Sequence, residues 1–119
     1  MSEPSTVLAN LMQVIAQRKD NPSEKSYTSR LMAGGVEKIG RKITEEAAEV
    51  VEAASEPGPE GHAHLVYEAA DLIYHLLVML GHRDATLAEV EAELARRFGV
   101  SGLEEKAARN RADTGPSAS

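Results

Sequence analysis

Residues 42–54 read KITEEAAEVVEAA and hold four acidic side chains: Glu45, Glu46, Glu49 and Glu52. In a helix these positions are neighbours, and each like-charged pair three or four residues apart costs a few tenths of a kcal/mol. A second acidic pair, Glu68 and Asp71, follows after 18 intervening residues and repeats the three-residue spacing of Glu46 and Glu49. Such crowding is tolerated either on a solvated helix face or around a bound cation.

A helical wheel of about 100° per residue places these acids relative to the apolar side chains. Glu46 borders the apolar stripe of its helix, Glu49 lies just outside the stripe one turn away, and Glu45 points further toward solvent. Glu68 and Asp71 lie beside the leucines of the next apolar segment. Each helix thus carries a carboxylate pair at the edge of its apolar face, and antiparallel packing would bring the two pairs together at the rim of the core.

Four carboxylates at the rim of a core are unfavourable alone, because burial and mutual repulsion both penalise the charged form. A divalent cation removes this penalty. A site made only of carboxylate oxygens suits Mg²⁺, with Mn²⁺ as a substitute, better than zinc or copper. Glutamate-rich helices are also common as solvated faces, so the residues alone leave the metal site and the solvated face as alternatives.

Basic side chains accompany the acidic motif. Lys38 and Lys42 lie on the same side of their helix as Glu46, and Arg30 stands in the element before it. The lysines either form ordinary ion pairs with glutamates one turn away or join a metal ion in holding phosphate groups. His75 lies on the helix face of Glu68, where we expect a structural hydrogen-bonding residue rather than a ligand.

The composition of the chain excludes several classes of function. It has 119 residues, a net charge of −6, 3% aromatic residues and no cysteine. The negative charge argues against binding nucleic acid through its phosphates, and the scarcity of aromatic side chains argues against a base-stacking surface. Disulfides and thiolate metal sites are excluded. No apolar stretch approaches the ~20 residues that cross a bilayer, so we expect a cytoplasmic protein with no signal peptide and no membrane partner.

Helical spacing of apolar residues runs through most of the chain, and no stretch shows the alternation typical of strands. We expect helices around residues 7–15, at 28–32, from about 36 to 54, from about 64 to 82 and, after a Thr86–Glu89 capping box, to about Phe98. Residues 19–26 and 55–63 are expected to be loops.

The expected fold is all-α, an antiparallel helical bundle that forms one domain over residues 1–99. Residues 100–119 are expected to be a C-terminal tail whose last residues are disordered. The apolar face of residues 64–82 is broader than one partner helix usually covers. We therefore expect a homodimer to complete the bundle.

Longer stretches resemble a known superfamily. KITEEAAEVVEAA followed by YEAADLIYHLLVML is similar to the all-α nucleotide pyrophosphatases, which include the MazG-type and dimeric dUTPase enzymes. More narrowly, three stretches resemble the phosphoribosyl-ATP pyrophosphatase family of histidine biosynthesis: SYTSRLMAGGVEKIGRKITEEAAEV, EAADLIYHLLVML and TLAEVEAELARRFGVSGLEEKAARN. They cover most of residues 26–110, and the acidic positions show no departure from the family's pattern.

The resemblance implies an enzyme that hydrolyses phosphoribosyl-ATP to phosphoribosyl-AMP and pyrophosphate and requires Mg²⁺. It implies four metal ligands: Glu46, Glu49, Glu68 and Asp71. It implies three catalytic glutamates: Glu45, Glu46 and Glu49. It also implies a substrate-binding set, with Ser26 in the same loop: Lys38, Lys42, Arg30, Tyr27 and Thr28.

Two other functions remain open. A house-cleaning pyrophosphatase of the same superfamily would share the fold and the metal site but act on free nucleoside triphosphates. A non-enzymatic helical dimerisation module would use the acidic edge to bind a basic partner and would show no metal dependence. Thermal stabilisation by millimolar Mg²⁺ would favour either enzyme over the module.

Overall fold

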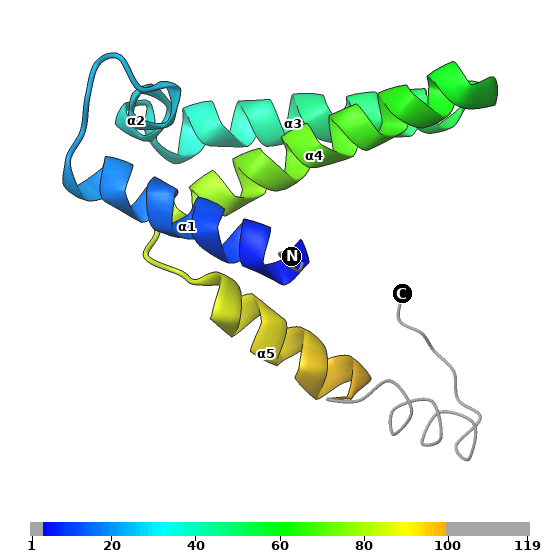
Figure 1. The fold of residues 1–119 in the computed structure, drawn as a ribbon. Coiled ribbons are helices and arrows are strands. Elements are labelled where there is room, and N and C mark those ends of the chain that lie inside the picture. Colours follow the sequence, from blue (N-terminus) through cyan, green and yellow to red (C-terminus); the bar gives the residue numbers. More distant parts are fainter. Residues whose placement is uncertain (1–3, 100–119) are drawn as a thin grey trace. The chain divides into compact units, whose positions relative to one another are not determined.

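The computed structural model of the protein describes residues 4–99. This part of the chain consists of helices and contains no strand, which confirms the all-α prediction (Figure 1). Five helices follow one another in the described range: α1 (Pro4–Asp20), α2 (Tyr27–Ala33), α3 (Gly35–Ala54), α4 (Gly58–His82) and α5 (Leu87–Phe98).

The chain divides into two compact units, residues 1–86 and 87–119. Helices α1 to α4 belong to the first unit, and α5 is the described part of the second. Helix α5 ends at Phe98 and is followed by Gly99 with φ 91°, the left-handed stop that its sequence predicts. The tail predicted at residues 100–119 lies outside the described residues.

Helices α3 and α4 lie side by side and antiparallel, and they make the most extensive contact in the first unit (Figure 1). The start of α3 is set by Gly35, whose φ of 74° lets the chain turn between α2 and α3. Helix α3 ends at Ala54, and a connector of three residues leads directly into α4. A connector this short favours antiparallel packing of α4 along α3.

The prediction that residues 55–63 form a loop is wrong for most of this segment. Helix α4 begins at Gly58, six residues before the expected start at His64. Pro59 lies in the first turn, where a missing N–H costs nothing because the first amides of a helix have no intrahelical acceptor. The dense glycine and proline of this segment therefore mark a helix start, and His64 lies well inside the helix rather than at its end.

The core of the first unit draws side chains from all four helices. Ile15 of α1, Leu31 of α2, Ile39 of α3 and Val78 of α4 are completely buried. Helix α1 is also tied to the end of α4 by Lys19, whose Nζ donates to the carbonyl of His82 at 2.8 Å. A cation at a helix C-terminus satisfies carbonyls that have no intrahelical donor.

Helix α3 does not bury all of the apolar residues that its helical spacing places on one stripe, which includes Val36, Val51 and Ala54. Val36 is 50% exposed and Val51 is 72% exposed, so they do not pack in the bundle within this chain. Ala53 is buried, whereas Ala54 is exposed. On α4, Ile73 is likewise left largely open to solvent.

One described helix, α4, is long and apolar enough to cross a membrane by length and composition. This differs from the expectation that no apolar stretch is long enough to cross a bilayer. Glu68 and Asp71 lie in the middle of this helix. Ionised side chains are costly inside a bilayer, and α4 packs along α3 and against α1. These features favour a helix of a soluble protein.

Two glycines give matched predictions for stability. A Cβ at Gly61 would lie 2.2 Å from the carbonyl oxygen of Glu56, a backbone atom that cannot move aside cheaply. A Cβ at Gly40 would meet nothing closer than Met79 Cε at 3.9 Å. Gly61→Ala should lower the free energy of unfolding by about 1–3 kcal/mol, whereas Gly40→Ala should raise it by up to about 1 kcal/mol. Urea denaturation followed by circular dichroism measures both, and equal stability of the two variants would contradict the close packing at the start of α4.

Candidate metal centre

The antiparallel pairing of α3 and α4 brings the two acidic motifs together. Glu46 and Glu49 of α3 form a group with Glu68 of α4, in which ligand oxygens of the three residues lie within 4.8 Å of one another. Glu46 belongs to a second such group with Asp71 and His75 of α4. All four predicted metal ligands thus meet around Glu46, and we call Glu46, Glu49, Glu68 and Asp71 the acidic cluster.

The two central carboxyl groups of the acidic cluster are buried. Glu46 and Glu68 are each only 6% exposed. Oε1 of Glu46 and Oε1 of Glu68 are inaccessible to solvent and receive no hydrogen bond from any described group. A buried oxygen without a donor costs about 1–3 kcal/mol, and more when it is charged. Burial of these two oxygens is therefore unfavourable unless a cation or a proton binds them.

Protonation of Glu46 lowers part of this free-energy cost. Burial, together with the neighbouring carboxyls of Glu68 and Asp71, raises the pKa of Glu46 from 4.5 to about 7. The pKa of Glu49 is also raised, chiefly by its hydrogen-bonding contact with Glu68. Burial acts in the same direction on Glu68, but contacts with Glu46, Glu49 and His64 outweigh it and lower the pKa of Glu68. Below pH about 7 this favours a protonated Glu46 beside a charged Glu68.

His64 is a member of the site that the sequence analysis missed. Its Nε2 lies 3.1 Å from Oε2 of Glu68, and its Nδ1 lies 2.9 Å from Oε1 of Glu56. These contacts raise the pKa of His64, with the Glu56 contact as the main cause. His64 stands four residues before Glu68, a spacing that could have revealed it had the helix been expected to start earlier. Glu56 lies in the segment expected to be a loop, and its carboxylate pairs with Nδ1 of His64.

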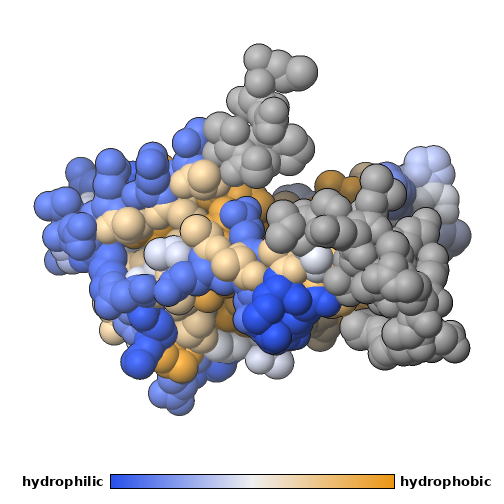
Figure 2. All heavy atoms as spheres, turned by 90° about the horizontal axis from the view of Figure 1, so that it is seen from below, coloured by the Kyte–Doolittle hydropathy of each residue, from blue (hydrophilic) through white to orange (hydrophobic). Residues whose placement is uncertain are grey.

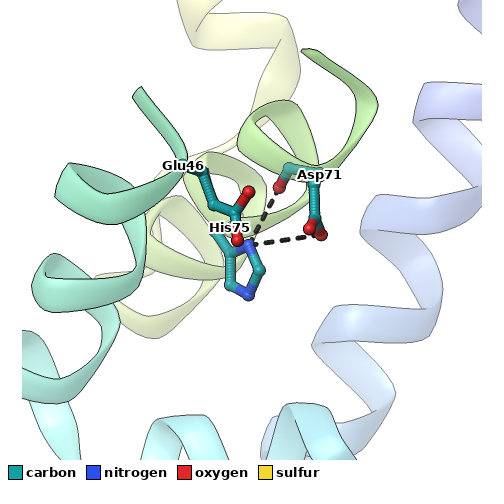
Figure 3. A group of neighbouring side chains, drawn as sticks. All are labelled: Glu46, Asp71 and His75. Carbon is teal, nitrogen blue, oxygen red and sulfur yellow. Dashed lines mark hydrogen bonds and ion pairs between the residues drawn. The ribbon is translucent and has the colours of Figure 1, made fainter. Parts of the chain in front are cut away.

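His75 forms the other boundary of the acidic cluster (Figure 3). The ring is 2% exposed; its Nδ1 lies 2.9 Å from the backbone carbonyl of Asp71 and 3.7 Å from Oδ1 of the same residue. Its Nε2 lies 2.9 Å from the hydroxyl oxygen of Tyr27. Both ring nitrogens are engaged, which confirms the expected hydrogen-bonding histidine and leaves the metal ligands to be oxygens.

Lysine side chains lie along the α3 side of the cluster. Nζ of Lys42 is 3.3 Å from Glu45 and 4.0 Å from Glu46, so the ordinary ion pairs weighed from the sequence are present. The hydrogen bond with Glu45, which is itself exposed, is the main cause of the raised pKa of Lys42. The stem of Lys38 lies over Gly34, and its ammonium group has no ion-pair or hydrogen-bond partner among residues 4–99.

The predicted substrate-side loop forms the start of α2. Ser26 is the N-cap and accepts a hydrogen bond from the amide of Ser29. Thr28 is buried with its hydroxyl paired to that of Tyr74. The guanidinium of Arg30 lies 5.9 Å from the centre of the Tyr27 ring and donates to the carbonyl of Glu24. Of this set, Tyr27 is the residue that reaches the acidic cluster, through His75.

A separate hollow of about 270 Å³ lies beside α1 and α2, lined by Arg18, Lys19, Met32, Ala33 and His82 among others. No residue of the acidic cluster lines it. The C-terminal ends of α1, α2 and α4 meet there, and helix C-termini carry partial negative charge that disfavours anions. Lys19 is already committed to the carbonyl of His82. This hollow is therefore a poor phosphate site, despite its basic side chains.

The acidic cluster fits a hard divalent cation. It offers carboxylate oxygens from two rigid helices, and two of these oxygens are buried with no donor in the part of the chain that the structure describes. Such ligands suit Mg²⁺ or Mn²⁺ rather than softer metals. Glu46, Glu49, Glu68 and Asp71 are the residues that can hold the ion.

Comparison with known proteins identifies the family of the chain. Residues 8–98 match the family model described as phosphoribosyl-ATP pyrophosphohydrolase. Three relatives carry the name phosphoribosyl-ATP pyrophosphatase. That of Rhodopirellula baltica is 53% identical over 109 residues, which span 92% of this chain and 91% of the relative. That of Geotalea daltonii is 49% identical over 88% of this chain and 96% of its own length, and that of Dinoroseobacter shibae is 52% identical over 87% and 99%.

The matched region runs from within α1 to the end of α5 and contains the whole acidic cluster, and the identity is near one half over almost the full length of each relative. The chain therefore belongs to the phosphoribosyl-ATP pyrophosphohydrolase family.

Proposed function

We propose that this protein is a soluble cytoplasmic enzyme of histidine biosynthesis that hydrolyses phosphoribosyl-ATP to phosphoribosyl-AMP and pyrophosphate with the help of Mg²⁺. The substrate comes from the names of relatives about 50% identical to this chain. The observation that carries the chemistry is the acidic cluster, in which buried carboxylate oxygens from α3 and α4 lack a donor among the described residues. Hydrolysis of a phosphoanhydride by an acidic protein needs such a cation site to offset the charge of the triphosphate.

When bound, a divalent cation supplies positive charge that stabilises the leaving pyrophosphate. In this proposal Glu46, Glu49, Glu68 and Asp71 hold it. Lys38 and Lys42 face the phosphates from the first half of α3. The ammonium group of Lys38 has no ion-pair or hydrogen-bond partner in the described part of the chain, and this supports its role in binding phosphate. Lys42 stands within 4.0 Å of Glu46 at the edge of the cluster.

The protein also has to activate a water molecule. A cluster carboxylate orients the water and accepts its proton while the water oxygen attacks the α-phosphorus, and the bond from the α-phosphorus to the bridging oxygen breaks. Glu49 is the favoured base because it is exposed and its contact with Glu68 raises its pKa above the usual value. Glu45, which pairs with Lys42 at 3.3 Å, orients that lysine. Arg30, Tyr27 and Thr28 belong to the substrate side at the start of α2.

The substrate is tested by assaying pyrophosphate release. We expect release from phosphoribosyl-ATP, complete loss in EDTA, and loss of at least 100-fold (about 2.7 kcal/mol) in Glu46→Gln and Asp71→Asn with unchanged helical circular dichroism. Glu60→Gln is the matched control, because Glu60 is exposed and outside the cluster.

Release from free nucleoside triphosphates alone would replace the proposed substrate with that of a house-cleaning pyrophosphatase. No release from any substrate, with or without metal, would leave a helical module without this activity.

The pKa of Glu46 gives a prediction for the metal-free protein. In the folded state Glu46 keeps its proton up to pH about 7, whereas an unfolded glutamate releases it near 4.5. The folded protein therefore binds more protons in this window, and the free energy of unfolding should fall as pH rises from about 4.5 to 7. Glu46→Gln should make the free energy of unfolding depend less on pH in this range. The difference in pH dependence between wild type and variant is then the contribution of Glu46.

Thermal melts test whether a metal ion binds at the acidic cluster. Mg²⁺ binds the ionised form, so 10 mM Mg²⁺ should raise the melting temperature of the wild type by roughly 2–8 °C at pH 8 and much less at pH 5.5. Glu46→Gln should lose this response, and Glu60→Gln should keep it. An equal response in Glu46→Gln would place the ion elsewhere.

We also propose that two copies of the chain associate. Large apolar side chains are exposed along α3 and α4: Val36, Val51, Val66, Ile73 and Leu76. Figure 2 views the molecule from below Figure 1 and does not single out these residues; on the face that it draws, hydrophobic side chains also lie open between hydrophilic ones. Exposed apolar patches of this kind mark contact surfaces in soluble proteins.

Sedimentation velocity at micromolar concentration should give about twice the chain mass of 12.8 kDa. Leu76→Glu, which places a charge on this surface, should shift the protein toward the monomer. A wild-type monomer over the whole concentration range would refute the dimer.

A further inference from the structure

Tyr27 and His75 connect two elements of the site that are 48 residues apart in sequence. The phenol of Tyr27, at the first residue of α2, lies 2.9 Å from Nε2 of His75 in α4. The opposite nitrogen, Nδ1, lies 2.9 Å from the carbonyl oxygen of Asp71. His75 therefore stands between the acidic cluster and the residue that begins the substrate-side helix.

These two contacts determine the direction of each hydrogen bond. A backbone carbonyl only accepts, so Nδ1 of His75 must carry the hydrogen that it shares with Asp71. In the neutral ring Nε2 is then the acceptor, and the hydroxyl of Tyr27 must donate to it. The only hydrogen of this hydroxyl is used, and its oxygen is left with lone pairs for an outside donor.

The orientation of Tyr27 is fixed in advance of any ligand. Its ring stacks against Tyr74 with centroids 6.2 Å apart and meets the His75 ring edge-on at 5.9 Å. The Tyr74 hydroxyl is in turn paired with Thr28, the next residue of α2. Tyr27 nevertheless remains 42% exposed, so a ligand can reach it. Burial of its hydroxyl end raises the pKa of Tyr27, which keeps the group a neutral phenol.

An acceptor at this place discriminates between the parts of a nucleotide. Ionised phosphate oxygens only accept hydrogen bonds and are repelled by another acceptor, whereas sugar hydroxyl groups can donate. Donors for phosphates are found on α3, where Lys42 borders Glu46. The two sides of the site thus present opposite polarity to a substrate that lies across them.

We propose that His75 is a positioning residue that holds the Tyr27 hydroxyl as an acceptor for a sugar hydroxyl group of the nucleotide substrate. The inference rests on the proposed function, since it requires a nucleotide whose phosphates lie at the acidic cluster. It assigns Tyr27 a task beyond general substrate contact: the phenol sets the register in which the triphosphate enters the site. His75 acts only through Tyr27 and is not itself in contact with the substrate.

The experiment compares two ligands that cannot be hydrolysed, the α,β-methylene analogues of ATP and of 2′,3′-dideoxy-ATP. Their dissociation constants are measured by calorimetry on the Mn²⁺-loaded protein. A hydrogen bond of ordinary strength predicts that the wild type binds the ribose analogue about three- to ten-fold more tightly. Tyr27→Phe and His75→Asn should bring this ratio close to one. His75→Gln, whose amide oxygen can accept from Tyr27, should restore part of it.

Matched controls are available on α4. Tyr67 is 68% exposed, and Tyr67→Phe should keep the wild-type ratio. His62 is exposed, and His62→Asn should do the same. Mn²⁺ binding without nucleotide, measured by electron paramagnetic resonance, should stay within about two-fold of wild type in Tyr27→Phe. That measurement separates loss of sugar recognition from damage to the acidic cluster, and circular dichroism reports whether each variant folds.

Three results would overturn the inference: equal affinity of the wild type for both analogues, a wild-type ratio in Tyr27→Phe, or a wild-type ratio in a folded His75→Asn. If the ratio behaves as expected but phosphoribosyl-ATP releases no pyrophosphate, the proposed substrate fails and the sugar contact stands. If phosphoribosyl-ATP is hydrolysed and the ratio is one in the wild type, only the sugar contact fails.

Discussion

The contact between Glu46 and Glu68 across the α3–α4 pair is the constraint on which the site depends. Two carboxyl groups, each 6% exposed, face one another, and each has an oxygen that no donor from residues 4–99 reaches. Left charged and unpaired, such groups would oppose the packing that buries them. The ion-free protein relieves the conflict in two ways: a proton stays on Glu46 up to pH about 7, and His64 pairs with Glu68. A divalent cation would relieve it more completely, so the same feature that weakens the fold makes the site ready for a metal.

The surrounding elements make this burial possible. The short connector forces α4 back along α3, and the early start of α4 extends the paired length of the two helices. Helix α1 crosses onto α4 and is tied to its end through Lys19. Rigid helices rather than loops therefore hold the four carboxylates, which is the arrangement that metal ligation and catalysis require. Stability is given up at Glu46 and Glu68 and recovered in the buried core around Ile15, Leu31 and Ile39.

Sequence reasoning predicted the helices and the acidic cluster because both follow from one periodicity. Glu46, Glu49, Glu68 and Asp71 share a spacing of three and border apolar stripes, so antiparallel packing was enough to bring them together. The start of α4 was missed because glycine and proline break helices in their interior yet are tolerated in a first turn. That error also concealed His64, which was placed at a helix end.

Contacts between distant segments could not be read from local pattern. The pairing of Tyr27 with His75 depends on how α2 packs on α4, and a stretch as short as α2 carries too few residues to show which face is buried. The exposure of Val36 and Val51 was missed for a related reason. Periodicity says that a helix has an apolar face, but it does not say whether the same chain or a second copy covers it.

Helix α4 repeats one device on both sides of its acidic pair. His64 lies four residues before Glu68, and His75 lies four residues after Asp71, so each imidazole reaches an acidic residue on its own helix face. The far nitrogen of each ring then binds a different element, Glu56 in the connector for one and Tyr27 in α2 for the other. His64 pairs with the carboxylate of Glu68, whereas His75 pairs with the backbone carbonyl of Asp71, and such outer contacts commonly tune a metal site from outside its ligand set. The two histidines differ in their partners: His64 lies between two carboxylates, which raise its pKa, whereas the ring nitrogens of His75 pair with a backbone carbonyl and a phenol. One side of the cluster thereby carries an imidazole whose raised pKa favours the charged form, and the other carries the imidazole that orients the Tyr27 hydroxyl.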